Sequence, residues 1–386
     1  MKINDKVYHM IIPVYIILSF FLLPVNFSKY INVFFLLIFS FSFIFKFLRN
    51  GKISFYAYNI IIILATCGIS LISTIFSNFG FFDLVITTLN VLIIYAVSKK
   101  EESIKNNASS YHIFYKASTL FLTVYLLFCF LYIKNLNNID NSFHLYSTWD
   151  KNYSAVIIFF YMCLSMRLNK KYGFILSIIY TILLNSRMLQ LCSVISILIY
   201  VANSKKRISK KHFSGINFKK PSTIILISSS LTIALSYYLT FMVSPRLISS
   251  YQESIYDKSN AIRVRANVYA VEELTKHPRY LLYGYDGSIK KQLSVEDEKT
   301  AVIYRGYRLV QPHNFILNFV LRYGLIYTLI YLILIDKILL RYNSRNNNFI
   351  LYPYIIMNMI MHSLMSTGLL VFFVYILASK TEEDHE

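Results

Sequence analysis

Charged residues are scarce in this chain, and their scarcity limits the class of protein it can be. Only 15% of the 386 residues are charged, whereas a soluble domain has about 25%. Hydrophobic residues make up 56% and aromatic residues 17%. Apolar runs of ~17–25 residues, the length at which a helix crosses a bilayer, recur along the whole chain. We therefore exclude soluble enzymes and expect an all-α integral membrane protein.

The chain also lacks the motifs of several common active sites. It has no glycine-rich phosphate loop, no His/Cys cluster with zinc spacing and no Ser/His/Asp nucleophile signature. No paired-carboxylate spacing supports a glycosidase-type acid and base. Because all of the cysteines fall inside apolar runs, we expect no disulfide, no metal site and no cofactor. They are Cys67, Cys129, Cys163 and Cys192.

Positive charge exceeds negative charge, with a formal net charge of +20. The basic residues gather in the short connections between apolar runs, as in the segment 205–211. This distribution is typical of cytoplasmic loops that follow the positive-inside rule. It therefore favours membrane lipids over nucleic acid as the partner of the basic residues.

Hydropathy and loop charge together predict about twelve transmembrane helices, with both termini in the cytoplasm. The N-terminal run lacks a cleavage site, so we expect it to remain as the first helix. The predicted domains are helices one to nine (1–241), a large periplasmic loop with short helices (242–311), and helices ten to twelve with a cytoplasmic tail (312–386). The spans lie near 7–25, 31–48, 56–76, 81–97, 113–133, 152–168, 172–185, 188–203, 221–241, 312–335, 349–362 and 364–379.

The sequence "NSR" at 185–187 divides two short predicted spans. A single helix through this region would bury Arg187 near the middle of the bilayer, at a cost of about 3 kcal/mol or more. We therefore expect two short, tilted helices, with Ser186 and Arg187 at the outer turn.

The predicted loop 242–311 is far longer than the usual connection of ~4–6 residues, and loops of this length usually carry function. Within it, "SNAIRVRANVYAVEELTKHP" predicts an amphipathic helix that Ser259 or Asn260 caps and Pro278 closes. Arg263 and Asn267 would share one face. The other face would carry Val264, Val268, Val271 and Leu274.

Arginines on the outer side are informative, because the positive-inside rule does not require them there. Their planar, permanently charged group suits phosphate oxygens. Each arginine also has an alternative to phosphate binding. Arg187 would snorkel to the membrane interface, and Arg263 and Arg265 would pair with Glu272 or Glu273. The candidates are Arg187, Arg263, Arg265, Arg279, Arg305 and Arg308.

The stretch "QPHN" is expected at the outer end of a span. Pro312 suits the first helical position, so His313 would lie in the first turn, where the helix dipole disfavours imidazolium. A neutral imidazole can act as a general base near pH 7. The alternative is a histidine hydrogen-bonded at the membrane interface. Asn314 is expected to cap or orient the start of the helix.

Three segments, in this order over roughly 150–335, together resemble the O-antigen ligase and polymerase superfamily of bacterial envelope glycosyltransferases. Asp286, in place of a glycine usual in the family's turn, departs from the pattern and leaves the details of the loop open. Met188 also departs from it. The segments are "LLNSRMLQLCSVISILIY", "SNAIRVRANVYAVEELTKHPRYLLYGYDG" and "QPHNFILNFVLRYGLI".

The resemblance implies metal-independent, inverting transfer of a polysaccharide from undecaprenyl pyrophosphate to a hydroxyl group, on the periplasmic side of the bacterial inner membrane. A departing pyrophosphate requires cations and the attacking hydroxyl requires a base. We assign Arg187, Arg263 and Arg265 to the pyrophosphate, His313 to the hydroxyl, and Asn314 to orienting the helix start.

Three functions are compatible with the sequence. We favour an O-antigen ligase, acting as a monomer, whose acceptor is a sugar of the lipid A core, because of the Pro-His-Asn form and the single dominant outer loop. A polymerase of the same superfamily would instead extend another lipid-linked repeat unit. A transporter of lipid-linked saccharides is the second alternative, although such proteins more often show two similar halves with broken helices.

Overall fold

The computed structural model describes residues 12–23, 27, 30–31, 34–35, 38, 108–132, 143–145, 151–208, 221–239, 258–284, 312–342, 345–360 and 368–379. Every regular element within these ranges is helical, which confirms the all-α prediction. The predicted spans 56–76 and 81–97 lie outside the described residues, and so does most of 31–48. The number of spans therefore stays a prediction.

A helix lies at each predicted span from residue 113 onward. Among the described residues, three helical stretches are long and apolar enough to cross a membrane by length and composition: Ser110–Leu131, Pro221–Tyr238 and Phe315–Ile333, the last of which is interrupted at Gly324. The elements are η1 (Leu18–Leu22), α6 (Ala108–Tyr132), α7 (Lys151–Arg167), α8 (Lys171–Leu184), α9 (Arg187–Ile208), α10 (Pro221–Tyr238), α12 (Lys258–Lys276), α13 (Tyr280–Tyr283), α14 (Phe315–Tyr342), η5 (Arg345–Asn347), α15 (Asn348–Ile360) and α16 (Gly368–Ala378).

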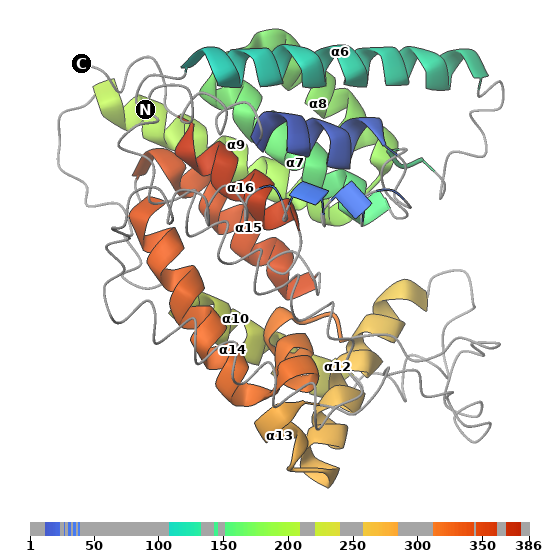
Figure 1. The fold of residues 1–386 in the computed structure, drawn as a ribbon, viewed down its shortest axis with the longest axis vertical. Coiled ribbons are helices and arrows are strands. Elements are labelled where there is room, and N and C mark those ends of the chain that lie inside the picture. Colours follow the sequence, from blue (N-terminus) through green and yellow to red (C-terminus); the bar gives the residue numbers. More distant parts are fainter. Residues whose placement is uncertain are drawn as a thin grey trace.

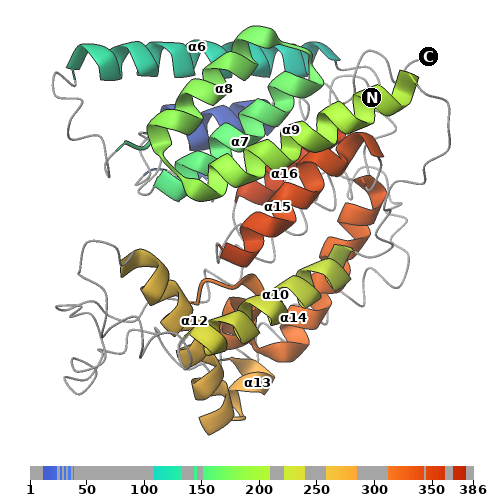
Figure 2. The same ribbon diagram turned by 180° about the vertical axis from the view of Figure 1, so that it is seen from behind.

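The helices form two groups, seen from opposite sides in Figures 1 and 2. One group holds α6 to α9 with α15 and α16, and the other holds α10 with α12 to α14. Helix α15 joins the groups, because it packs against both α9 and α10. We call the helix ends that are predicted to face the cytoplasm the inner ends, and the opposite ends the outer ends.

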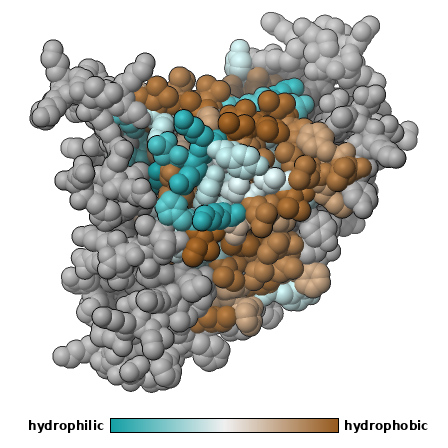
Figure 3. Space-filling view, turned by 90° about the horizontal axis from the view of Figure 1, so that it is seen from above, coloured by the Kyte–Doolittle hydropathy of each residue, from teal (hydrophilic) through white to brown (hydrophobic). Residues whose placement is uncertain are grey.

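Apolar side chains cover the outside of the molecule as well as its centre. Helix α16 is buried along its whole length. On α9, by contrast, Leu191, Val194 and Leu198 are more than half exposed and recur at helical spacing. Viewed from above, most of the described surface is apolar (Figure 3). A helix in water would turn such a stripe inward, so these exposed stripes, with the long apolar helices, indicate a membrane protein.

Arg167 ties the inner ends of several helices together. Its guanidinium is buried, and its Nη2 donates to the carbonyl of Asn346 (3.2 Å) and to Oδ1 of Asn347. Its Nη1 donates to carbonyls at the end of α16, those of Ile376 (2.7 Å), Leu377 (3.0 Å) and Ser379 (2.6 Å). The carbonyl end of a helix is its negative end. The charge of Arg167 is therefore stabilised by helix-end carbonyls.

A second inner contact links α10 to α14. Asp336 accepts a hydrogen bond from the backbone N–H of Ser222 (2.6 Å) and another from the Ser222 hydroxyl. A carboxylate at the start of a helix pairs with its free N–H groups and with its positive end. This contact brings the last part of α14 beside the first turn of α10, as the predicted alternation of spans requires.

Helix α14 is folded back on itself at Gly324, which has φ 81° and ψ 167°. The ring of Tyr331 lies 6.1 Å from that of Phe315 and 4.6 Å from that of Phe319. In a straight helix the first pair would be about 24 Å apart. The predicted span over 312–335 is therefore not one continuous helix. The helix has a short arm (315–323) and a long arm (325–342).

The bend has a cause in the sequence. Aromatic residues recur at every fourth position, so one face of α14 is aromatic on both sides of the glycine. Folding the arms together buries these rings against one another, and they are Phe315, Phe319, Tyr323, Tyr327 and Tyr331. Glycine at 324 permits the turn, because residues with a Cβ are essentially excluded from this region of φ and ψ.

The predicted amphipathic helix of the loop is present as α12, and it packs on the short arm. Ala270 and Leu274 form one apolar cluster with Leu317, Val320 and Leu321. The expected N-caps, Ser259 and Asn260, are wrong, because the helix begins earlier, at Lys258. Its end at Lys276 agrees with closure by Pro278. This part of the loop is therefore docked against the helical bundle.

Two glycines join the loop to the bend. Gly284 has φ 93° and ψ 174°, close to the conformation of Gly324. A Cβ on Gly284 would overlap the carbonyl of Arg322, and a Cβ on Gly324 would overlap the carbonyl of Leu282. The two chain segments thus cross backbone to backbone. We call this contact the glycine crossing.

Candidate functional site

The short arm begins at a well-defined cap. Oδ1 of Asn314 accepts a hydrogen bond from the N–H of Leu317 (3.1 Å), and Nδ2 donates to the carbonyl of Ser229 (3.0 Å). Asn314 is fully buried. The first helical residue is therefore Phe315, and Pro312 and His313 precede the helix. The prediction that Pro312 starts the helix, with His313 in its first turn, is wrong, because asparagine is the stronger N-cap and is held here by α10.

The short arm begins deep in the bundle. Ser229 lies halfway along α10, and Ser222 at its first turn is bonded to Asp336 near the inner end of α14. Seven residues of helix separate the two serines, or about 10 Å. The sequence predicted that "QPHN" marks the outer end of a span. In the structure it lies below the outer end of α10 instead. The His313 side chain is partly exposed at this depth.

The turn at Arg187 agrees with the prediction of two helices. Helix α8 ends at Leu184, Asn185 adopts a left-handed conformation (φ 44°, ψ 42°), and α9 begins at Arg187. Ser186 is buried, and its hydroxyl donates to Oδ1 of Asn152 (3.4 Å). Arg187 itself is exposed. A cation in the first turn adds to the positive end of the helix. Together they form a location that favours an anion.

Arg263 and Arg265 lie in the first half of α12, where the structure describes the backbone but not these side chains. Helical register puts position 263 on the face of Asn267, Ala270 and Leu274, which are buried. Position 265 falls on the opposite face. The expectation that Arg263 and Asn267 share a face agrees with this register, and that face is a packed one: Nδ2 of Asn267 donates to the hydroxyl of Ser236 on α10 (3.2 Å).

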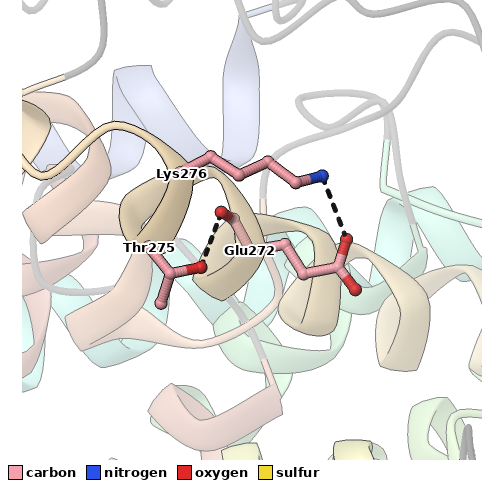
Figure 4. Close-up of polar contacts among 3 residues, drawn as sticks. All are labelled: Glu272, Thr275 and Lys276. Carbon is pink, nitrogen blue, oxygen red and sulfur yellow. Dashed lines mark hydrogen bonds and ion pairs between the residues drawn. The ribbon is translucent and has the colours of Figure 1, made fainter.

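The acidic residues considered as partners of these arginines differ in environment. Glu272 lies 3.8 Å from Nζ of Lys276, and its carbonyl accepts a hydrogen bond from the Thr275 hydroxyl (2.8 Å; Figure 4). Both members of this ion pair are exposed, so it contributes at most about 1 kcal/mol. Glu273 is buried. Glu272 is thus engaged with a lysine of its own helix.

The remaining outer arginines have less to offer. The guanidinium of Arg279 lies 5.5 Å from the centre of the Tyr280 ring. Arg305 and Arg308 lie outside the described residues. Arg279 thus lies over an aromatic ring at the surface of the loop.

The starts of α9 and α12 lie on one side of the molecule, toward the right in Figure 1 and toward the left in Figure 2. The starts of α9 and α12 belong to different helix groups, which face each other there. Within the described ranges, no three His, Cys, Asp or Glu side chains form a group that could hold a metal ion.

Sequence reasoning gave no role to the serines of α10. Ser229 and Ser236 are both buried. The Ser236 hydroxyl accepts a hydrogen bond from Asn267 of α12, whereas Asn314 of α14 donates to the backbone carbonyl of Ser229. The Ser236 hydroxyl was therefore an available signal, but the Ser229 contact uses a carbonyl that any residue would supply. The partners, Asn314 and Asn267, could not be assigned to them without the fold.

Comparisons with known proteins add nothing to this geometry. No family model, no curated protein and no solved structure matches the chain. Function is therefore inferred from the residues themselves and from the resemblance stated above.

Proposed function

We propose that this protein is a membrane glycosyltransferase that transfers a saccharide from undecaprenyl pyrophosphate to a sugar hydroxyl. The first candidate function is that of an O-antigen ligase of the bacterial inner membrane. Its acceptor is a sugar of the lipid A core on the periplasmic side. The observation that carries the proposal is the placement of partly exposed His313 directly before the buried cap Asn314, which holds the start of the short arm against α10.

His313 acts as the general base in this proposal. The acceptor oxygen attacks the anomeric carbon, its proton passes to the imidazole, and the bond from that carbon to the phosphate oxygen breaks with inversion. Asn314 supports this role indirectly. Its two hydrogen bonds fix the chain next to the histidine, with one to the short arm and one to α10.

The arginines receive the leaving group. As the carbon–oxygen bond breaks, its electron pair remains on the pyrophosphate, so positive charge placed there lowers the barrier. Arg187 at the exposed start of α9 is the best-described candidate. Arg263 and Arg265 on α12 complete the proposed set. A guanidinium can bind two phosphate oxygens at once, which an ammonium cannot do in the same geometry.

A polymerase of the same superfamily is the second candidate, and one observation favours it. Asn314 is bonded halfway along α10, so the adjacent base would work below the outer ends of the helices. An acceptor sugar carried on a short lipid-linked repeat unit stays close to the membrane. The lipid A core holds its acceptor sugar further out.

A transporter of lipid-linked saccharides is the third candidate. Its support is the break in α14, because broken helices commonly form substrate sites in transporters. The other half of a symmetric transporter would need a matching break. The described helices show this non-helical glycine inside α14 alone.

A vesicle assay separates the three functions. Purified protein is mixed with lipid-linked polysaccharide and lipid A core, and the products are resolved on a gel. A new, slowly migrating glycolipid supports the ligase, and longer lipid-linked chains without core attachment support the polymerase. Translocation of the lipid-linked saccharide with no new glycosidic bond contradicts both transferases.

A further inference from the structure

His313 lies well below the outer end of α10 and is still partly exposed. Its neighbour Asn314 is bonded to the middle of α10, nine residues of helix from the outer end at Tyr238, or about 13 Å. The His313 side chain is nevertheless partly exposed. An ionisable side chain at such a depth is costly against lipid, so in membrane proteins it faces water or a polar partner.

Polar side chains continue from this point toward the outer end of α10. Ser236 lies on the same face as Ser229, two turns further out, and it holds Asn267. Because the Ser236 hydroxyl donates its own proton to the carbonyl of Thr232 (2.8 Å), the Asn267 group facing it must be the donating NH2. Oδ1 of Asn267 then points elsewhere, buried and with no hydrogen-bond partner. A bound water molecule is a common partner of such an atom, and the atom itself is closed to bulk solvent.

Two contacts keep the histidine at this depth. The rings of Phe315 and Phe319 lie against Tyr331, which folds the short arm back along the long arm. The glycine crossing holds the bend against the loop. With a straight α14, the nine residues of the short arm would carry His313 outward, beyond the bend.

We propose that the short arm of α14 borders a water-filled recess open to the outer side, in which the pyrophosphate and the acceptor hydroxyl meet at His313. The inference rests on the proposed function for the identity of these groups. The recess itself rests on the bend, on the bond that holds Asn314 at the middle of α10, and on the exposure of His313. The reacting groups of the substrate are thus drawn below the outer end of α10.

Cysteine accessibility tests the recess. In a variant whose four native cysteines are replaced by serine, His313→Cys is treated from the outer side with a charged, membrane-impermeant methanethiosulfonate reagent. The matched control is Ile333→Cys. Ile333 lies two residues from Tyr331, at a similar depth. It is 46% exposed on the apolar surface of α14 that faces away from the bundle. Recovery of each variant in the membrane fraction checks its insertion.

The recess predicts that the thiol of His313→Cys is modified and that of Ile333→Cys is not, because the reagent needs a thiolate in water. An unmodified thiol in His313→Cys overturns the recess. Equal modification of both variants overturns it as well, since the control face would then be in water rather than lipid. Activity is not used in this readout. If His313→Cys is modified but His313→Ala keeps full transferase activity, the recess stands and the proposed function fails.

A cross-link tests the bend independently. The double variant Phe315→Cys/Tyr331→Cys is treated with a short bifunctional thiol reagent, and the linked peptides are identified by mass spectrometry. The folded-back arms predict an intramolecular link, because the two rings are 6.1 Å apart. A straight helix separates these positions by about 24 Å, which the reagent cannot span. Failure to link in a correctly inserted protein overturns the proposal.

Discussion

The side-chain amide of Asn314 donates to the backbone carbonyl of Ser229 at 3.0 Å. The same side chain caps the short arm through the N–H of Leu317. One residue therefore sets both where the helix starts and how deep that start lies along α10. His313 precedes it directly, so its position depends on these two bonds.

Asn314→Asp separates these two roles. Above the pKa of its carboxyl group, an aspartate still accepts from Leu317 but cannot donate to Ser229, whereas Asn314→Ala does neither. Loss of the cap costs about 1 kcal/mol, and loss of the bond to Ser229 about as much again. We expect Asn314→Ala to lower the free energy of unfolding in detergent by about 2 kcal/mol, and both variants to lose transferase activity. An aspartate variant with full activity would show that the bond to Ser229 does not position the base.

Arg187→Lys tests whether charge alone serves at the start of α9. The lysine keeps the positive charge but lacks the planar fork that binds two phosphate oxygens. We expect a loss of at least about tenfold in kcat/KM, with normal membrane insertion because Arg187 is exposed. Lys171→Arg, at the exposed start of α8, is the control and should remain active. A fully active Arg187→Lys would reduce this residue to an interfacial charge.

The glycine crossing predicts two equivalent substitutions. Gly284→Ala and Gly324→Ala each place a Cβ against a carbonyl of the other segment, in a region of φ and ψ that is essentially restricted to glycine. We expect each to lower the free energy of unfolding by roughly 2–4 kcal/mol, measured by thermal denaturation in detergent. Leu325→Ala, at an exposed neighbour, is the control. Unchanged midpoints for both glycine variants would contradict the crossing.

Arg167 predicts a purely structural effect. Replacing it by leucine leaves the carbonyls of Leu377 and Ser379, at the end of α16, without the donor that the guanidinium supplies, which costs about 1–3 kcal/mol for each such buried group. We expect markedly less folded protein in the membrane and a lower thermal midpoint. Lys170→Leu, three residues away and exposed, should change stability by less than about 0.5 kcal/mol. Equal stability of the two variants would show that the hydrogen bonds from Arg167 to the end of α16 do not stabilise the fold.

The sequence predicted the helices better than their relations. Apolar runs and the "NSR" turn located α6 to α10, because length and polarity decide where a membrane helix begins and ends. The fold-back at Gly324 was not predicted. Hydropathy counts apolar residues without regard to direction, so two arms that meet at a glycine look like one long span. The four-residue spacing of the aromatic rings was visible, but their contact across the bend was not.

The sequence predicted which residues belong to the candidate site but not how deep they lie. His313, Asn314 and Arg187 stand out by residue type beside an apolar run, and sequence reasoning could list them. Their depth could not be read, because it depends on the bond from Asn314 to Ser229, which joins residues far apart in the chain. Pro312 also led to a wrong prediction of where the helix starts, because Asn314, two residues later, provides the stronger cap.

The most direct test of the central claim is the transfer reaction itself, with and without the base. Purified wild-type protein and His313→Ala are compared in vesicles that contain lipid-linked polysaccharide together with both acceptors, lipid A core and lipid-linked repeat units. His277→Ala, at an exposed histidine of the loop, is the matched control. We predict a new glycosidic product with the wild type and the control, and none with His313→Ala at equal membrane recovery. Equal product from His313→Ala would contradict the account.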